Sequence, residues 1–418
     1  MKLYLKITFI LLISLLSGSN AFAMFRYVGG DISLLPEYEK AGAVYKDENG
    51  KRISDLIPFL SDCGMNAMRV RLFVNPDEYL AANPDADKNA CQSLEYIIPL
   101  CKRITEAGMS LMLDFHYSDT WADPAAQWTP DRWKELSDDD LAVKIGQYTE
   151  SVLKELKDNG ITPSFIQPGN EISYGMLWGT PDDDNPKKVF TSSSANWKRF
   201  ASLLNSAIAK CREVCPDAKI IIHSERTGHN AELRTFYYNL ISEKVDFDII
   251  GLSYYPYFHC PLSSLDSTLS YLEKNLGNYP VMIVETGFPY KWEVPGTTEK
   301  VDYEYSEEGQ DKFASDLVET LRKHENVDGL FWWWLEYNAY GTNLSGWYNA
   351  PLFDSTTGKA CKALKTICSF ADGNGSSINA VSQDETDGNI WYRLDGTRAD
   401  NKTLPGIYLS KNRKIIVR

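Results

Sequence analysis

The chain has 418 residues, a formal net charge of −14 and an aromatic content of 12%. The acidic balance argues against nucleic acid or an anionic lipid surface as a partner. A chain of this length can bury a sizeable core, and beyond its first residues no stretch reaches the ~20 apolar residues of a membrane helix.

The N-terminal segment has the pattern of a secretory signal peptide. Lys2 and Lys6 precede a short apolar run over residues 7–16, and Ala21-Phe22-Ala23 offers small residues at a cleavage position. We expect residues 1–23 to be removed, with a buried N-terminal helix as the alternative. The mature chain is then an exported monomer in the periplasm, at the cell surface or outside the cell.

Eight cysteines follow this segment, and export permits disulfides. There is no Cys-x-x-Cys pair and no spacing that resembles a zinc site, so the sequence predicts neither a metal nor another cofactor. Buried thiols and one or two disulfides remain equally open. The cysteines are Cys63, Cys91, Cys101, Cys211, Cys215, Cys260, Cys361 and Cys368.

Short apolar or β-branched runs alternate with helical patterns through most of the chain. After a first strand near Phe25, strands are expected to begin near Ala67, Ser110, Phe165, Ile220, Ile249, Val281 and Gly329. Helical periodicity covers Leu94–Ala107, Leu141–Lys157, Trp197–Val214 and Gln310–His324. This alternation predicts an α/β protein with a (β/α)₈ barrel over residues 24–371. A doubly wound sheet is the alternative, but no Gly-rich phosphate fingerprint follows an early strand.

The composition changes after Phe370. Residues 372–389 begin with a Gly/Ser/Asn-rich stretch typical of a linker. Residues 390–418 contain short alternating runs that predict a small β-hairpin tail. Such a tail is consistent with sorting or attachment, and equally with a simple accessory segment.

In a barrel of this kind the chemistry lies where each strand ends. In the second strand Arg69 and Arg71 are two residues apart, so both side chains point to the same face. A buried arginine needs a carboxylate partner, which could be structural or functional. The third strand ends in polar residues and one ring suited to stacking against a sugar face. These are Asp114, His116, Asp119 and Trp121.

Two glutamates end the fourth and seventh strands. Glu171 follows Asn170 soon after a short apolar start, and Glu285 is the first polar residue after the buried run Val281–Val284. Two carboxyl groups ~5–5.5 Å apart are what a retaining glycosidase needs, whereas a gap of roughly 6.5–9.5 Å indicates inversion. An arginine beside Glu285 would keep it ionised as nucleophile, and Glu171 would hold its proton as acid/base. A structural carboxylate that pairs with Arg69 or Arg71 is the alternative for Glu285.

The remaining strand ends supply further candidates for sugar binding. His223 follows the fifth strand, and Tyr254 and Tyr255 follow the sixth, where a hydroxyl could reach the nucleophile. Three tryptophans end the eighth strand, and one of them, for which we choose Trp333, is expected to form the floor under the sugar.

These motifs together resemble glycoside hydrolase family 53, the arabinogalactan endo-β-1,4-galactanases of the clan A barrel glycosidases. The resemblance spans about residues 27–363, and its most specific part is the string Ser118-Asp119-Thr120-Trp121-Ala122-Asp123-Pro124. That string belongs to the longer carrier Asp114–Pro124, and the other carriers are Gly29–Ser33, Asn66–Pro76, Gly169–Ile172, Ser253–Pro256 and Val284–Thr286.

The resemblance implies endo-hydrolysis of the β-1,4-galactan side chains of pectin with retention, with Glu171 as acid/base and Glu285 as nucleophile. It also implies that Arg69, His116, Asn170 and one of Tyr254 and Tyr255 surround the reacting sugar. Some relatives have Trp-Glu-Pro-Ala-Trp at the eighth strand, where this chain has Trp334-Leu335-Glu336-Tyr337-Asn338. Some bind calcium near the seventh and eighth strands, but residues 290–308 offer no clear ligand cage. A clan A enzyme acting on mannan, glucan or xylan, and a glycan-binding barrel without catalysis, remain alternatives.

Overall fold

The computed structural model describes residues 25–190, 194–259, 261–297, 299–340 and 350–372, together with the backbone of four short strands between residues 391 and 417. The chain divides into two compact units. The larger unit covers Arg26–Ala371, and the smaller unit contains the four described strands between residues 391 and 417. The expected signal peptide and almost all of the expected linker lie outside the described residues.

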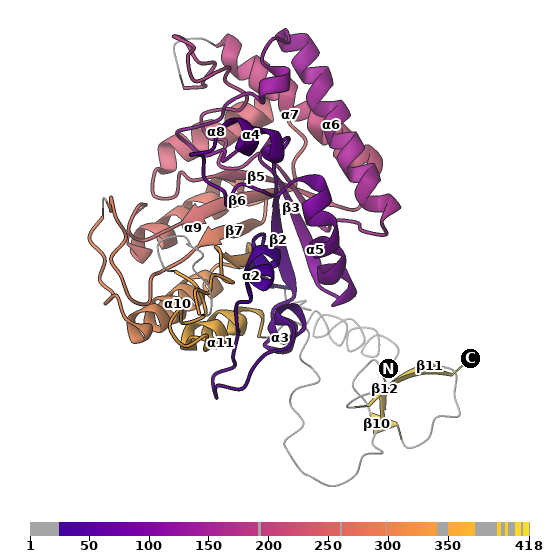
Figure 1. The fold of residues 1–418 in the computed structure, drawn as a ribbon, viewed down its shortest axis with the longest axis vertical. Helices are drawn as coiled ribbons and strands as arrows, with labels where there is room; N and C mark the ends of the chain where they lie inside the picture. Colours follow the sequence, from indigo (N-terminus) through magenta and orange to yellow (C-terminus); the bar gives the residue numbers. More distant parts are fainter. Residues whose placement is uncertain are drawn as a thin grey trace, which may run out of the picture. The chain divides into compact units, whose positions relative to one another are not determined.

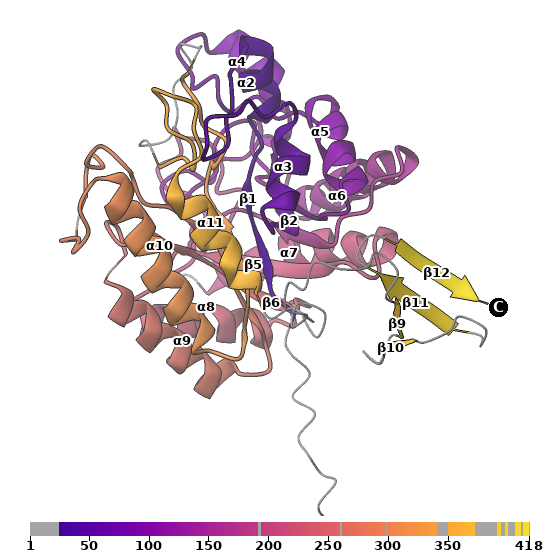
Figure 2. The ribbon, with the colours of Figure 1, turned by 90° about the horizontal axis from the view of Figure 1, so that it is seen from below.

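Eight parallel strands form a closed barrel in the larger unit, in the order β1 to β8, which confirms the predicted fold class. Figures 1 and 2 show the strands at the centre with helices around them. The strands are β1 (Tyr27–Asp31), β2 (Ala67–Leu72), β3 (Ser110–Phe115), β4 (Phe165–Pro168), β5 (Lys219–Ser224), β6 (Ile249–Tyr254), β7 (Val281–Thr286) and β8 (Val327–Trp332).

Helices connect the strands on the outside of the barrel. Four were predicted within a few residues of their ends: α5 (Leu94–Glu106), α6 (Asp138–Asp158), α7 (Ala195–Val214) and α10 (Glu307–Arg322). The others are α2 (Leu35–Ala41), α3 (Leu56–Asp62), α4 (Pro76–Ala82), α8 (Asn230–Ser242), α9 (Leu262–Leu276) and α11 (Lys362–Cys368), with the 3-10 turns η1 (Asp131–Trp133) and η2 (Ser369–Ala371).

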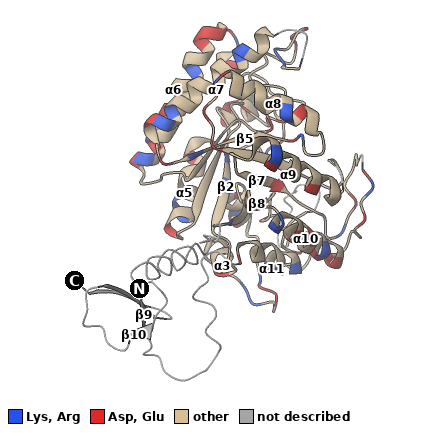
Figure 3. Cartoon of the chain, turned by 180° about the vertical axis from the view of Figure 1, so that it is seen from behind, with Lys and Arg blue, Asp and Glu red and all other residues tan. Residues whose placement is uncertain are grey.

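The longest helix, α6, shows how local sequence sets these elements. The Ser137 hydroxyl accepts a hydrogen bond from the Asp140 amide at 3.2 Å, and three aspartates in the first turn favour the positive end of the helix dipole. Positions occupied by charged residues recur along α6 and α7 (Figure 3).

The core has two layers, as the alternation of side chains along barrel strands requires. The barrel interior holds a small apolar cluster, which is Ala67, Met112, Phe165, Ile221, Ile249, Met282, Val284 and Phe331. A larger cluster, which includes Met68, Val70 and Leu72, fills the space between strands and helices. Residues of the opposite parity in β2 therefore point inward, and Arg69 and Arg71 are among them.

The alternation is interrupted near the end of β7. Met282 and Val284 both belong to the interior cluster, so strict alternation would turn Glu285 outward. The register of β7 against β8 shifts between Ile283 and Thr286, and that of β6 against β7 shifts between Leu252 and Ser253. Such irregularities re-aim side chains, and here Glu285 faces Arg69 inside the barrel mouth.

The smaller unit contains an antiparallel sheet in the order β10-β9-β11-β12. Its strands are β9 (Trp391–Arg393), β10 (Arg398–Ala399), β11 (Gly406–Ser410) and β12 (Arg413–Val417). β11 and β12 pair as a hairpin, and β9 and β10 add two strands to the hairpin that was expected.

Two further predictions concern cysteines and membrane spans. In the described part of the chain, Cys63, Cys91, Cys101, Cys211, Cys215 and Cys361 are thiols that form no disulfide. Of the helices that the structure describes, none has the length and apolar character needed to cross a bilayer.

Candidate active site

A cavity of about 570 Å³ opens at the C-terminal mouth of the barrel. This is the end at which barrel enzymes carry their active sites. Both predicted catalytic glutamates line it. The lining residues are Asp87, Asn89, Trp121, Ala122, Asp123, Pro124, Asn170, Glu171, Glu225, Tyr255, Phe258, His259, Glu285, Trp333 and Trp334.

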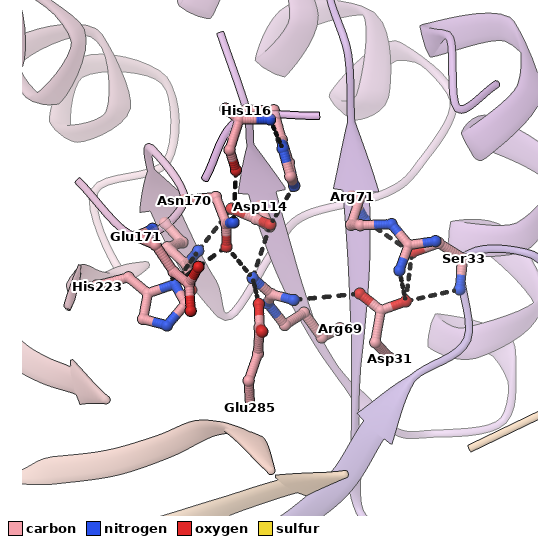
Figure 4. A network of polar contacts seen from close by, with 12 residues as sticks. Asp31, Ser33, Arg69, Arg71, Asp114, His116, Asn170, Glu171, His223 and Glu285 are labelled. Carbon is pink, nitrogen blue, oxygen red and sulfur yellow. Dashed lines mark hydrogen bonds and ion pairs between the residues drawn. The ribbon is translucent and has the colours of Figure 1, made fainter. Parts of the chain in front are cut away.

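Arg69 is the charged centre beneath this cavity (Figure 4). Its guanidinium is fully buried and lies 2.7 Å from Asp114, 2.9 Å from Glu285 and 3.3 Å from Asp31. It also donates to the side-chain oxygen of Asn170 at 2.8 Å. One cation thus connects the ends of β1, β3 and β7 and the residue that precedes Glu171.

Asp114 and His116 form a second buried contact beside Arg69. His116 Nε2 lies 3.1 Å from Asp114 Oδ2, while its Nδ1 accepts from the Ala122 amide at 3.1 Å. Burial acts to raise the pKa of Asp114, but Arg69 and His116 outweigh it and lower this pKa. Burial lowers the pKa of His116 and so favours its neutral form. The pair therefore supports an ionised carboxylate under the cavity.

Glu171 projects into the cavity from a strained position just after β4. Its φ of 48° is in the left-handed region, which non-glycine residues adopt infrequently. The Ser253 hydroxyl donates to Glu171 Oε1 at 2.6 Å, and His223 Nε2 lies 2.8 Å from that hydroxyl. His223 Nδ1 accepts from the Glu171 amide at 3.3 Å, so the proton of a neutral His223 ring is on Nε2. His223 thereby orients Glu171 from both sides.

Glu285 lies opposite, held by Arg69 and by Tyr255, whose hydroxyl donates to Glu285 Oε2 at 3.2 Å. Burial raises the pKa of Glu285 to about 7, while Arg69 and the Tyr255 hydrogen bond act to lower it. Glu171 has no cation among the main influences on its pKa. Burial, then Glu285, then Glu225 raise that pKa well above its usual value. The two carboxyl groups are thus inequivalent, with Glu171 the better proton holder.

Three tryptophans form one wall of the cavity. The Arg71 guanidinium lies over the rings of Trp121, Trp333 and Trp334 at 4.9, 4.7 and 5.4 Å from their centroids. Cation–π contacts of this kind hold the rings in place behind the cavity. The remaining tryptophan at the end of β8, Trp332, is fully buried, and its indole N–H donates to the Ala350 carbonyl.

Most of the predicted binding residues meet here, but at different depths. Trp121, Asn170, Tyr255 and Trp333 line the cavity. Arg69, Asp114, His116 and His223 form the buried layer of polar contacts beneath it. The structure separates the remaining two from the cavity lining. The Asp119 carboxylate accepts from the amides of Asn75 and Asp131, and the Tyr254 ring stacks against Phe313 of α10.

Other site residues were not among those predicted. Ser253 and Gln167 are ordinary polar residues in their strands, and Gln167 donates to Asp114 at 2.6 Å. Asp31 receives hydrogen bonds from both Arg69 and Arg71. Its place next to two glycines at the end of the first strand was the available signal. Glu225 follows the fifth strand directly, whereas Phe258 and His259 belong to a loop whose approach to the cavity is visible only in the fold.

Comparison with known proteins points to one family. The model of the family described as Glycosyl hydrolase family 53 matches residues 27–367. An arabinogalactan endo-β-1,4-galactanase of Thermothelomyces thermophilus is 34% identical over 82% of this chain and 98% of its own length.

Two solved structures give a consistent result. A fungal β-1,4-galactanase superposes with a TM-score of 0.69 at 30% identity, covering 82% of this chain and 99% of its own. The GH53 catalytic domain of Ignisphaera aggregans has a TM-score of 0.70 at 27% identity, covering 84% of this chain and 97% of its own.

Proposed function

The chain belongs to glycosyl hydrolase family 53, and on that premise we propose that it cleaves β-1,4-galactan internally, with retention of anomeric configuration. The observation that carries the proposal is the placement of Glu171 and Glu285 in one cavity with unequal surroundings. Galactanase activity is the function that similar proteins bear in their names.

The proposed mechanism assigns each glutamate a role that follows from its contacts. Glu285, beside Arg69, attacks the anomeric carbon and forms a glycosyl–enzyme bond, while protonated Glu171 gives its proton to the departing oxygen. Glu171, now ionised, then takes a proton from water as that water attacks the anomeric carbon and releases Glu285. Tyr255 and Arg69 hold the carboxylate of Glu285, and Ser253 holds that of Glu171.

Substitution of the two glutamates tests the assignment. Glu171→Gln and Glu285→Gln should each lower kcat on galactan by about 10³-fold or more. The first variant loses the proton transfers, and the second loses the covalent step. Circular dichroism and the unfolding midpoint should stay near those of the wild type. Turnover near normal in either folded variant would contradict the role of that glutamate.

Two other functions are separated by substrate. An enzyme for mannan, glucan or xylan would share the pair of glutamates, so release of reducing sugar should be compared across these polysaccharides and galactan. We expect galactan to be the preferred substrate. A barrel that only binds glycans would be slowed on electrophoresis in a gel that contains galactan. It would release no shorter oligosaccharides, which product sizing would reveal.

The place and context of the activity are also proposals. The pattern of residues 1–23 supports export of the enzyme, which would meet galactan as a side chain of pectin outside the cytoplasm. We propose that it acts there as a monomer. Mass spectrometry of the protein secreted by its host should show a mature N-terminus near Met24. Retention of residues 1–23 would contradict the expected cleavage.

A further inference from the structure

A line across the barrel mouth from β4, which precedes Glu171, to β7, which carries Glu285, divides the mouth into a larger and a smaller side. Because strands follow in the order β1 to β8 around the closed barrel, β5 and β6 lie on one side of β4 and β7, and the other strands lie on the opposite side. All three cavity tryptophans follow β3 or β8, on the larger side. The smaller side carries Glu225, Phe258 and His259.

In the proposed mechanism the two sides hold different sugars of the substrate. The acid must lie between the sugar that is attacked and the sugar that leaves, since it protonates the oxygen that joins them. The tryptophan wall provides the stacking surface for the attacked sugar. The leaving sugar then extends past Glu171 toward the next strand of the barrel, β5, and toward the β6 loop.

Glu225 is an unusual residue to find on this smaller side. The residue is only 8% exposed, yet it lines the cavity, and neither carboxylate oxygen forms a hydrogen bond within the part of the chain that the structure describes. Burial raises the pKa of Glu225 to about 7, while the nearby Ser173 hydroxyl and the backbone amide of Glu225 act to lower it; that hydroxyl is engaged with the Ser224 hydroxyl at 2.7 Å. The nearest cation is Arg226, whose Nε lies 3.3 Å from Glu225 and 3.4 Å from Glu232. A buried carboxylate usually has hydrogen-bond donors, so this one is prepared to accept them from a ligand.

His259 and Phe258 complete the set of groups that a pyranose ring requires. His259 Nδ1 accepts from the Tyr255 amide at 2.9 Å, and burial lowers the pKa of His259 to about 4. The ring is therefore neutral at ordinary pH, with its proton on Nε2 as a donor. The smaller side thus offers an acceptor at Glu225, a donor at His259 and an apolar ring at Phe258.

We propose that Glu225, with His259 and Phe258, forms the subsite for the leaving-group sugar, where Glu225 accepts hydrogen bonds from its free hydroxyls. In a β-1,4-linked hexopyranose those hydroxyls are at positions 2, 3 and 6, because oxygen 4 belongs to the bond being cleaved. The inference rests on the proposed hydrolase function and adds to it a residue that selects a sugar as leaving group.

Two substrates distinguish binding of the leaving-group sugar by Glu225 from a general effect of Glu225 on catalysis. Galactan places a sugar on the smaller side, whereas nitrophenyl β-1,4-galactobioside places there a ring without hydroxyls. Above pH 7, where Glu225 is ionised, Glu225→Gln should lower kcat/KM on galactan about 10-fold and Glu225→Ala about 100-fold, because a charged hydrogen bond is weakened or lost. The loss on the aryl substrate should be far smaller.

The matched control is Glu232→Gln. It removes the same charge from the same arginine, but Glu232 is half exposed and is not among the cavity residues. Both substrates should be turned over by this variant at the wild-type rate. Since Glu225 also raises the pKa of Glu171, full pH profiles should be compared rather than rates at one pH.

A third measurement uses galactobiose as an acceptor. Transfer of the glycosyl group to this disaccharide requires the same subsite, so Glu225→Gln should lower the ratio of transfer to hydrolysis with the aryl donor. Equal losses on galactan and the aryl substrate, with an unchanged transfer ratio, would overturn the proposal. Failure of the wild type to cleave either substrate would instead overturn the hydrolase function.

Discussion

Tyr255 shows how a single hydroxyl adjusts the charge of the proposed nucleophile. It donates to Glu285 Oε2 at 3.2 Å, and a hydrogen bond to the ionised form lowers the pKa of a carboxyl group. Its neighbour Tyr254 instead turns outward and stacks against Phe313. The sequence offered both tyrosines, and only the parity of the β6 strand distinguishes their surroundings.

The pair gives a prediction with an internal control. Tyr255→Phe removes the hydrogen bond, so the pKa of Glu285 should rise and the acidic limb of the kcat/KM profile should move to higher pH. We expect a loss of about 10-fold in kcat at the optimum, a typical order for one donor near the reacting carboxylate. Tyr254→Phe should leave the acidic limb in place. An acidic limb that does not move in Tyr255→Phe would show that Glu285 does not control it.

At the scale of elements, the approach of β1 to β2 positions Asp31 opposite Arg69. A Cβ at Gly29 would lie 1.7 Å from the Ala67 carbonyl oxygen, so the two strands can pair only because residue 29 has no side chain. Gly108 differs, since a Cβ there meets nothing within 4 Å, although its φ of 77° disfavours other residues.

These two glycines predict different effects of the same substitution. Gly29→Ala should reduce the free energy of unfolding by about 2–3 kcal/mol and lower galactanase activity, because the displaced strand carries Arg69. Gly108→Ala should cost only about 1 kcal/mol of backbone strain and leave kcat unchanged. Denaturant titrations and rates on galactan measure both. Equal destabilisation by the two would contradict a clash at Gly29.

Elements with strong local signals could be predicted from the sequence. The strands at Ser110 and Val281 begin where the apolar runs begin, and α6 is long enough to show its period. α4 has seven residues, too few for a clear period. The turn of Glu285 into the mouth depends on register shifts between strands, which leave no mark in local sequence.

The site was predictable to the same extent. Arg69 and Asp114 follow from alternation within one strand, so their inward direction could be inferred. Ser253 contacts Glu171 across 82 positions of sequence, and such a contact exists only once the barrel closes. Glu225 was visible as a polar residue after the fifth strand, but its burial and its lack of hydrogen bonds were not.

At the scale of the whole molecule, the proposed chemistry is confined to one unit. Every cavity-lining residue and all eight barrel strands lie within Arg26–Ala371. The family match also ends at residue 367, before the β9–β12 sheet begins.

A shortened chain of residues 24–371 should therefore keep the full kcat/KM on soluble galactan and the unfolding midpoint of the barrel. Activity assays and calorimetry beside the chain of residues 24–418 make the comparison. A substantial loss of kcat/KM in a folded fragment would mean that the C-terminal sheet contributes to substrate binding.

The charge of the cavity lining has a consequence for which polysaccharides can enter. Five acidic side chains line it, and no lysine or arginine does so among the described residues, while Arg69 beneath is already paired with three carboxylates. A uronic acid would bring a further carboxylate into this space, where the acidic side chains repel it and no lining cation can pair with it. We therefore expect this cavity to favour an uncharged galactan over a polysaccharide that contains uronic acids.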